Sequence, residues 1–258
     1  MSKHVFIKLN NKYDWGIVMS DEAKEKSEGW VDQWLEKETE HTQTALENAS
    51  KYFDDNDDLT VNTIEAVYGK ESSFGAMQKN RGIEEAAGHF QLRKPTAEEY
   101  GLIVSKGNDT RFDIDYASSA AARYLKDIDN AFSKKTTLIK GRDTIPVKDP
   151  SERKKFVLGA YNTGQGRVAR AQYLAEQAEK NPTIWDDVKE FLEAAGDSKE
   201  KADEARDYVE KVLVFENEFA KKSLANKKAK AKEGKSVTCR CSSGHWVTID
   251  DRPVFICD

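Results

Sequence analysis

Cysteine is missing from almost the whole of this 258-residue sequence. The three cysteines that it contains, Cys239, Cys241 and Cys257, all lie within the last twenty residues. The main body of the chain therefore cannot depend on disulfide bonds for its stability, and the chemistry of the C-terminal end is a separate question.

Long apolar runs and an excess of basic residues are missing as well. No apolar stretch approaches the roughly 18 residues that a membrane-spanning helix requires, so we expect no membrane span. The net charge is −5, and acidic and basic residues are interleaved along most of the chain, which argues against nucleic acid as a partner. The N-terminus has no apolar segment followed by a small-residue cleavage site, so we expect no secretory signal peptide.

The residues that are present are typical of a mainly helical protein. Charged residues make up 34% of the chain, and five Trp, nine Tyr and eleven Phe are more aromatic side chains than disordered proteins carry. Apolar residues recur at helical spacing, most clearly over 116–132. We expect further helices to begin near Ser20, Thr60, Thr96, Glu152, Thr183 and Ser198, and hairpins over 4–19, within 133–150 and near the C-terminus.

Composition divides the chain into three parts. We expect an N-terminal extension with a hairpin and a helix over residues 1–54, followed by the main helical domain over residues 55–220. Residues 221–258 begin with a run in which seven of fifteen residues are lysine, which indicates either a linker or a solvated helix extension. A small cysteine-containing hairpin completes this last part.

Three short segments carry the candidate chemistry: GKESSF at 69–74, GHFQL at 88–92, and GAYNTGQGRV at 159–168. Glu71 falls at the end of an apolar helix, where partial burial would raise the pKa of its carboxyl group and suit it to general acid catalysis. Gln91 and Asn162 both donate and accept hydrogen bonds, as sugar recognition requires. Each residue alone also has an ordinary explanation, as a solvated acid, a turn residue or a helix stop.

In their order and spacing, these segments resemble the soluble lytic transglycosylase domain, the goose-lysozyme-like branch of the lysozyme superfamily. The matching patterns are ESSF, G-x-x-QL followed by P-T-A-x-x-YGL, ARYLKD, AYN-x-G-x-GRV and EARDYV. Five patterns in the family's order, over roughly residues 55–215, make the resemblance specific. It implies a mainly α, lysozyme-like domain with a small β-hairpin element, flanked here by short β-containing terminal extensions.

The resemblance also implies a role for each matching residue. Glu71 corresponds to the family's catalytic glutamate, and Tyr161 to the tyrosine that positions its carboxyl group. The matching substrate-binding positions are Gln91, Phe90, Asn162, Glu204 and Tyr208.

The implied substrate is the β-1,4 bond between N-acetylmuramic acid and N-acetylglucosamine in peptidoglycan. One glutamate protonates the glycosidic oxygen and then accepts the proton of the sugar's own 6-hydroxyl, which leaves a 1,6-anhydro end. This chemistry implies no cofactor, and it differs from the two-carboxylate scheme of most glycosidases.

Two departures from the family pattern leave alternatives open. His89 and Phe90 replace the usual Leu and Met, and His89 is either a partly exposed loop residue or a part of the catalytic site. The loop before them carries Glu84 and Glu85. Because inverting glycosidases place a second carboxylate roughly 6.5–9.5 Å from the acid, a hydrolytic muramidase remains an alternative to the transglycosylase.

Asp113 and Asp115 are further candidate carboxylates, although capping of a helix N-terminus explains them better. At the C-terminus, Cys239, Cys241, His245 and Cys257 form a candidate zinc set with an unusually short C-x-C spacing. A disulfide from Cys257 to Cys239 or Cys241, and three free thiols, are the competing interpretations.

A peptidoglycan substrate and a missing signal peptide together predict specialised export. We expect a protein made in the cytoplasm that acts in the periplasm or cell wall of a target cell, as an antibacterial effector of the type VI secretion kind. Its partners would be a cognate immunity protein and a protein of the secretion apparatus. A phage lysin, a wall-binding module without activity and a scaffold protein are the alternatives, and the chain could be a fragment of a longer effector.

Overall fold

The computed structural model describes residues 21–78, 82–233, 244–249 and 252–257, and the side chains of 27–78 and 82–225. The chain divides into two compact units, Met1–Phe219 and Ala220–Asp258, which we describe separately. The hairpin expected over 4–19 lies outside the described residues, as do Cys239 and Cys241.

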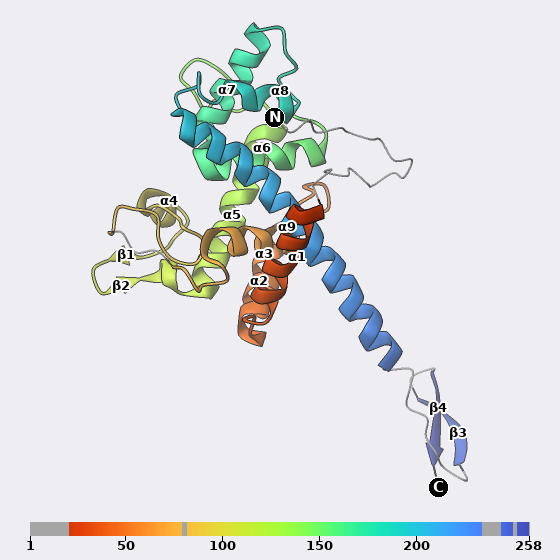
Figure 1. The fold of residues 1–258 in the computed structure, drawn as a ribbon. Helices are drawn as coiled ribbons and strands as arrows, with labels where there is room; N and C mark the ends of the chain where they lie inside the picture. Colours follow the sequence, from red (N-terminus) through yellow and green to blue (C-terminus); the bar gives the residue numbers. More distant parts are fainter. Residues whose placement is uncertain (1–20, 79–81, 234–243, 250–251, 258) are drawn as a thin grey trace. The chain divides into compact units, whose positions relative to one another are not determined.

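Helices dominate the first unit, which confirms the mainly α prediction (Figure 1). In chain order they are α1 (Asp21–Leu35), α2 (Glu40–Ser50), α3 (Val61–Ser72), α4 (Lys94–Glu99), α5 (Ile114–Ser133), α6 (Pro150–Thr163), α7 (Gln165–Gln177), α8 (Trp185–Val188) and α9 (Lys199–Glu233). Two short 3-10 helices, η1 (Thr110–Phe112) and η2 (Lys189–Phe191), lie among them. None of the described helices has the length and apolar composition that a membrane crossing requires.

The strands form two small antiparallel pairs. In the first unit, β1 (Val104–Ser105) pairs with β2 (Asn108–Asp109). In the second unit, β3 (Gly244–Ile249) pairs with β4 (Arg252–Cys257), which is the hairpin expected near the C-terminus. The hairpin expected within 133–150 is reduced to a single bridge between Ile139 and Arg142, because the preceding Leu138 N–H donates to the nearby Thr136 carbonyl and not across the turn.

Capping residues explain where several helices begin. Thr60 precedes α3, and its backbone N–H donates to the Thr63 Oγ1 at 2.9 Å. The Asp113 carboxylate accepts from the backbone of Asp115 at 3.0 Å, which makes Asp113 the N-cap of α5. Helix α4 begins at Lys94, earlier than the start expected near Thr96, because a proline without an N–H is well suited to the first helical turn.

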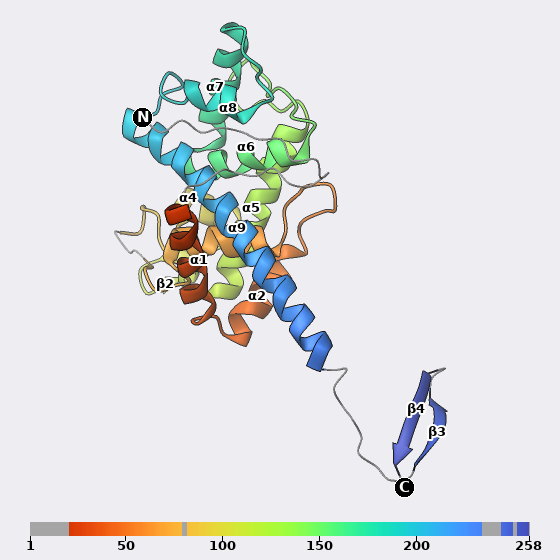
Figure 2. The same cartoon turned by 45° about the vertical axis from the view of Figure 1, so that its right-hand side comes forward.

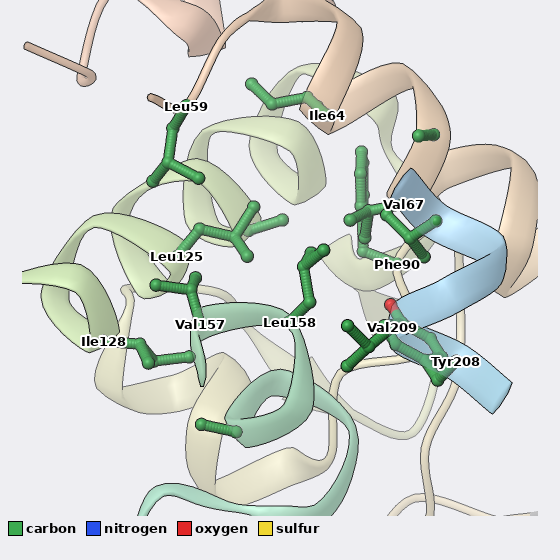
Figure 3. Close-up of a cluster of buried hydrophobic side chains, with 14 of the residues drawn as sticks. Leu59, Ile64, Val67, Phe90, Leu125, Ile128, Val157, Leu158, Tyr208 and Val209 are labelled. Carbon is green, nitrogen blue, oxygen red and sulfur yellow. The ribbon is translucent and has the colours of Figure 1, made fainter. Parts of the chain in front are cut away.

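Helix α5 is the centre of the first unit and packs against α2, α3 and α6. Its apolar face was predicted correctly: Leu125, Ile128 and Phe132 are fully buried. Figure 3 shows Leu125 and Ile128 facing Val157 and Leu158 of α6. Burying side chains of this kind contributes about 1.5–3 kcal/mol each, so the α5 face supplies a large part of the folding free energy.

Helix α1 packs beside α9 and against the C-terminal half of α3 (Figures 1 and 2). The Trp34 ring lies 4.7 Å from the ring of Phe215 and 6.3 Å from that of Phe219, both on α9. A Cβ added at Gly69 of α3 would approach the same Trp34 ring to 2.4 Å. Glycine is therefore required at this position for the indole to reach the helix that carries Glu71.

Three carboxyl groups meet where α1, α2 and α3 come together. Burial, followed by the charges of Glu38 and Glu47, raises the pKa of Glu65 to about 8. Burial and the charge of Glu47 also raise the pKa of Glu38, whose Oε1 is buried without a hydrogen-bond partner among the described residues. Like charges so close together favour keeping a proton on Glu65.

Gly69→Ala should lower the free energy of unfolding by about 1–3 kcal/mol, because the new methyl group forces the Trp34 ring out of its site. Gly29→Ala in α1 is the matched control, since a Cβ there meets no atom within 4 Å. Alanine in place of this second helical glycine should stabilise the protein slightly. Urea unfolding of both variants makes the comparison, and equal effects would contradict the packing argument.

Glu65→Gln should remove a loss of stability at alkaline pH. The carboxyl group ionises near 4.5 in the unfolded chain and near 8 in the folded one, so the folded state binds more protons between these values. The stabilisation is complete below pH 4.5 and is lost as the pH rises through about 8. Between pH 5 and 9 the free energy of unfolding, measured with urea, should fall for the wild type and for the exposed control Glu193→Gln. It should fall less steeply for Glu65→Gln.

Candidate active site

Glu71 is half-buried in the last turn of α3. The helix ends there because Ser73, Phe74 and Gly75 all adopt left-handed backbone conformations, with φ values of 51°, 56° and 80°. Such conformations cost about 1–3 kcal/mol for residues other than glycine. The buried Phe74 ring offsets this cost by packing 4.6 Å from the ring of Tyr68 and 6.0 Å from that of Trp34.

Two tyrosines approach the Glu71 carboxyl group, Tyr161 from α6 and Tyr208 from α9. Burial, followed by the charge of Glu71, raises the pKa of Tyr161 and of Tyr208 well above the ordinary value. Both side chains are therefore neutral hydroxyls, and their rings are stacked 6.5 Å apart. Neutral hydroxyls beside a carboxylate stabilise its charged form without competing for its proton.

The two hydroxyls are held differently. Tyr161 donates to the backbone carbonyl of Phe90 at 2.8 Å. The Tyr208 hydroxyl is buried and has no partner of standard hydrogen-bond geometry among the described residues, although a weaker hydrogen-bonding contact with Glu71 contributes to its raised pKa. A long contact of this kind can tighten when a proton moves, because such bonds are commonly loose before substrate binds.

Asn162 and Glu204 lie together at the side of this group. A hydrogen bond from Lys201 lowers the pKa of Glu204, and the Asn162 side chain and the charge of Lys70 lower it further. The Lys70 Nζ lies 5.3 Å from the centre of the Tyr208 ring. The Asn162 Oδ1 is buried without a partner among the described residues, so it is an unsatisfied acceptor at the side of this group.

Gln91 lies on the loop that follows GHF, with a left-handed φ of 48°. Its Nε2 donates to the Gly88 carbonyl at 2.8 Å, which fixes the side chain against its own turn. The neighbouring Phe90 is 1% exposed, and its ring stacks 5.2 Å from the ring of Tyr68. Phe90 was predicted to line the substrate cleft, but its side chain is part of the core and its carbonyl is what reaches Tyr161.

A buried arginine holds the loop of residues 82–92 in place. The Arg111 guanidinium donates to the carbonyls of Glu85, Leu92 and Ile83, and it forms an ion pair with Asp109 at 2.7 Å. Arg111 is 1% exposed, so its charge is compensated entirely within the protein. Nothing in the sequence pattern around Arg111 distinguishes a buried arginine from an exposed one, so this residue was not predicted.

Glu84 and Glu85, the candidate second carboxylates, both lie on this loop. The Glu84 carboxylate accepts from the Lys94 Nζ at 2.7 Å, and that of Glu85 is 3.9 Å from the Arg93 guanidinium. Their side chains are 70% and 56% exposed. Both are thus engaged in surface ion pairs, and their role in activating water remains a prediction.

A cavity of about 410 Å³ lies apart from Glu71, over α4 and α5. Its lining residues are Tyr52, Glu99, Tyr100, Arg123, Lys126 and Asp127. Several of these polar groups are paired with one another or with nearby residues, as in the 2.9 Å bond from the Tyr100 hydroxyl to Asp127. None of the residues that line this cavity belongs to the group around Glu71.

A metal centre is not evident in the described part of the chain, where no group of three His, Cys, Asp or Glu side chains could hold an ion. The candidate set of Cys239, Cys241, His245 and Cys257 falls outside the described side chains, so its state remains a prediction.

The segment that carries Glu71 matches a known protein family. The family model described as "Transglycosylase SLT domain" matches residues 48–184. The chain belongs to this family. The resemblance inferred from the motifs is thereby confirmed, and the SLT match runs from the last turn of α2 to the residue before α8. Glu204 and Tyr208, on α9, lie outside it.

Relatives of this SLT protein include proteins named membrane-bound lytic murein transglycosylase F. The one from Desulfosudis oleivorans is 30% identical over 162 residues, which cover 59% of this chain and 31% of the relative. The one from Shewanella oneidensis is 33% identical over 105 residues, or 41% of this chain and 18% of the relative. The matched region is thus less than a third of the length of either relative.

Arg111→Met should lower the free energy of unfolding by about 3–5 kcal/mol, because it leaves a half-buried carboxylate and three carbonyls without their partner. Arg93→Met is the matched control on the same loop, since Arg93 is 67% exposed and its ion pair is long. An exposed pair contributes at most about 1 kcal/mol. Urea unfolding measures both variants. Similar losses of free energy of unfolding would contradict the conclusion that Arg111 holds the loop of residues 82–92 in place.

Proposed function

We propose that this protein cleaves the glycan strands of peptidoglycan as a lytic transglycosylase, with Glu71 as its single acid and base. The observation that carries the proposal is the position of Glu71, half-buried at the end of α3 and faced by two neutral tyrosine hydroxyls. Membership of the SLT family and the names of the relatives support the same reaction class.

The residues suit a two-step proton transfer. Glu71 donates its proton to the glycosidic oxygen as the bond from that oxygen to C1 of N-acetylmuramic acid breaks. The resulting carboxylate, beside which the Tyr208 hydroxyl is placed to donate, then accepts the proton of the sugar's 6-hydroxyl while that oxygen bonds to C1. Glu71 recovers its proton, and the products are a 1,6-anhydro end and a free 4-hydroxyl.

Neighbouring side chains supply polar contacts for the sugars. The unpartnered Asn162 Oδ1 suits an N–H donor, and the acetamido groups of both sugars provide one. Glu204 is exposed beside Asn162. Gln91 is half-buried on the turn to which its own side chain is hydrogen-bonded. These assignments fit a cleft in which positioning, rather than a second charged group, does most of the work.

The alternative is hydrolysis by a muramidase on the same fold. It requires a carboxylate that activates water, and Glu84 and Glu85 are the residues that could supply it. Their exposed ion pairs with Lys94 and Arg93 favour the single-carboxylate reaction, because a general base needs a lone pair directed at its water.

Glu71→Gln should lower the rate of digestion of purified peptidoglycan at least a hundredfold, since it removes the proton donor. The double variant Glu84→Gln, Glu85→Gln is the control and should retain most of the activity. Mass spectrometry of the products should find anhydro ends, lighter by one water than reducing ends. Reducing ends, lost in the double variant, would establish the muramidase instead, and full activity in Glu71→Gln would remove Glu71 from the mechanism.

We also infer a role as an exported antibacterial effector, with a cognate immunity protein and a secretion-apparatus protein as partners. The inference extends the peptidoglycan cleavage proposed above, because a cell can use such an enzyme against the wall of a rival. Targeting the chain to the periplasm with an added signal sequence should lyse the host, whereas cytoplasmic expression should not. A phage lysin without an immunity partner is the alternative. A small neighbouring open reading frame with a signal peptide would favour the effector over the lysin.

A further inference from the structure

His89 lies where three segments of the candidate active site meet. Its Nδ1 is 2.9 Å from the Tyr68 hydroxyl of α3 and 3.0 Å from the Gln78 Nε2, on the loop that follows Glu71. Its Nε2 is 3.1 Å from the carbonyl oxygen of Phe112, at the end of η1. The mechanism proposed above makes no use of this ring, although it is half-buried and bonded on both nitrogens.

The partners of His89 define its protonation state. A carbonyl oxygen can only accept, so the Nε2 carries the hydrogen that binds Phe112. The Nδ1 then offers its lone pair to the Tyr68 hydroxyl, and the Gln78 amide nitrogen lies 3.0 Å from Nδ1 and 3.1 Å from Nε2. Two donors against one ring are the pattern of a neutral imidazole. Burial lowers the pKa of His89 despite the opposing effects of the Phe112 carbonyl and the charge of Asp113, so the neutral form is favoured near neutral pH.

The same residue joins two left-handed turns. The His89 carbonyl accepts from the Ser72 Oγ at 2.7 Å, and the Ser72 Oγ in turn accepts from the Gly75 N–H at 3.1 Å. Gly75 belongs to the turn that ends α3 directly after Glu71, and the turn with Gln91 begins two residues after His89. Strained backbone persists only where its surroundings hold it, and His89 contributes to that support on both sides.

We propose that neutral His89 is a positioning residue for the reaction, which locks the turn after Glu71 to the turn with Gln91, and that protonation of its ring releases this lock. The proposal rests on the proposed function for its link to catalysis. The groups that face the ring are the Tyr68 hydroxyl from α3, the Gln78 amide from the loop and the Asp113 carboxylate at the start of α5. Protonation turns the Nδ1 acceptor into a donor, so the Tyr68 hydroxyl can no longer donate to it and has to turn to accept, while the Gln78 Nε2, which can only donate, is left facing another donor.

Three substitutions separate the parts of the lock. His89→Asn places an amide group where the Nδ1 lies, and His89→Gln places one where the Nε2 lies, so each retains one side of the contact without titrating. His89→Leu retains neither. At pH 7.5 we expect kcat of His89→Leu to fall between about tenfold and a hundredfold with a smaller change in KM, because a misplaced Glu71 impairs the chemical step. Asn and Gln should each restore part of the loss.

The pH profile distinguishes a lock from a merely structural residue. As the pH falls from 7.5 through the range in which the ring takes up a proton, the wild type should lose the advantage that it holds over His89→Leu, so the two rates converge. Tyr68→Phe retains the ring packing of Tyr68 and should reduce the same advantage. His41→Gln is the control, since His41 is 67% exposed in a surface pair with Asp115, and its profile should match the wild type.

The outcomes decide the proposal. Wild-type rates in His89→Leu at both pH values would overturn it, and a constant deficit at every pH would leave His89 with a structural role and overturn the switch. If the wild type digests no peptidoglycan, the proposed function fails, and NMR titration of the His89 ring in the full chain still tests the lock. A His89 resonance that titrates below about pH 6.5 and shifts upward in Tyr68→Phe supports the lock, whereas an unchanged titration refutes it.

Discussion

The structure depends on one constraint, which is that a carboxyl group has to be held in the last turn of a helix. The helix dipole disfavours a negative charge at this end, so Glu71 needs other groups to stabilise it once it has given up its proton. Neutral tyrosines from α6 and α9 lie close enough for the charge of Glu71 to raise their pKa values. The left-handed turn that follows Glu71 is secured by the aromatic packing of Phe74 and by the bonds of Ser72 and His89.

Much of the fold could be predicted because it depends on short-range patterns. The buried face of α5 follows from apolar spacing, and the caps Thr60 and Asp113 follow from side chains that compete for backbone N–H groups. The lysine run proved to be a helix extension, since α9 continues to Glu233. The pair of β1 and β2 was missed because two-residue strands are too short to show alternation.

The candidate site was less accessible to prediction, since its motifs identify residues but not their surroundings. Phe90 and Tyr208 were both expected to contact substrate, yet each is 1% exposed, and burial of this kind depends on residues distant in the sequence. Arg111 and the contacts of His89 could not be foreseen for the same reason. The roles of Glu71, Gln91 and Asn162 in catalysis and binding, and the separate N-terminal extension over 1–54, remain predictions.

The contact between Trp34 and Gly69 has a consequence for where this domain can be divided. The SLT match begins at residue 48 and ends at 184, so Trp34, Tyr208, Phe215 and Phe219 all lie outside it. A piece cut at those borders would expose the groove over Gly69 to water and would lose one of the two hydroxyls beside Glu71. The borders of the family match and the physical borders of the folded unit therefore do not coincide: α1 and the part of α9 up to Phe219 pack into the first unit.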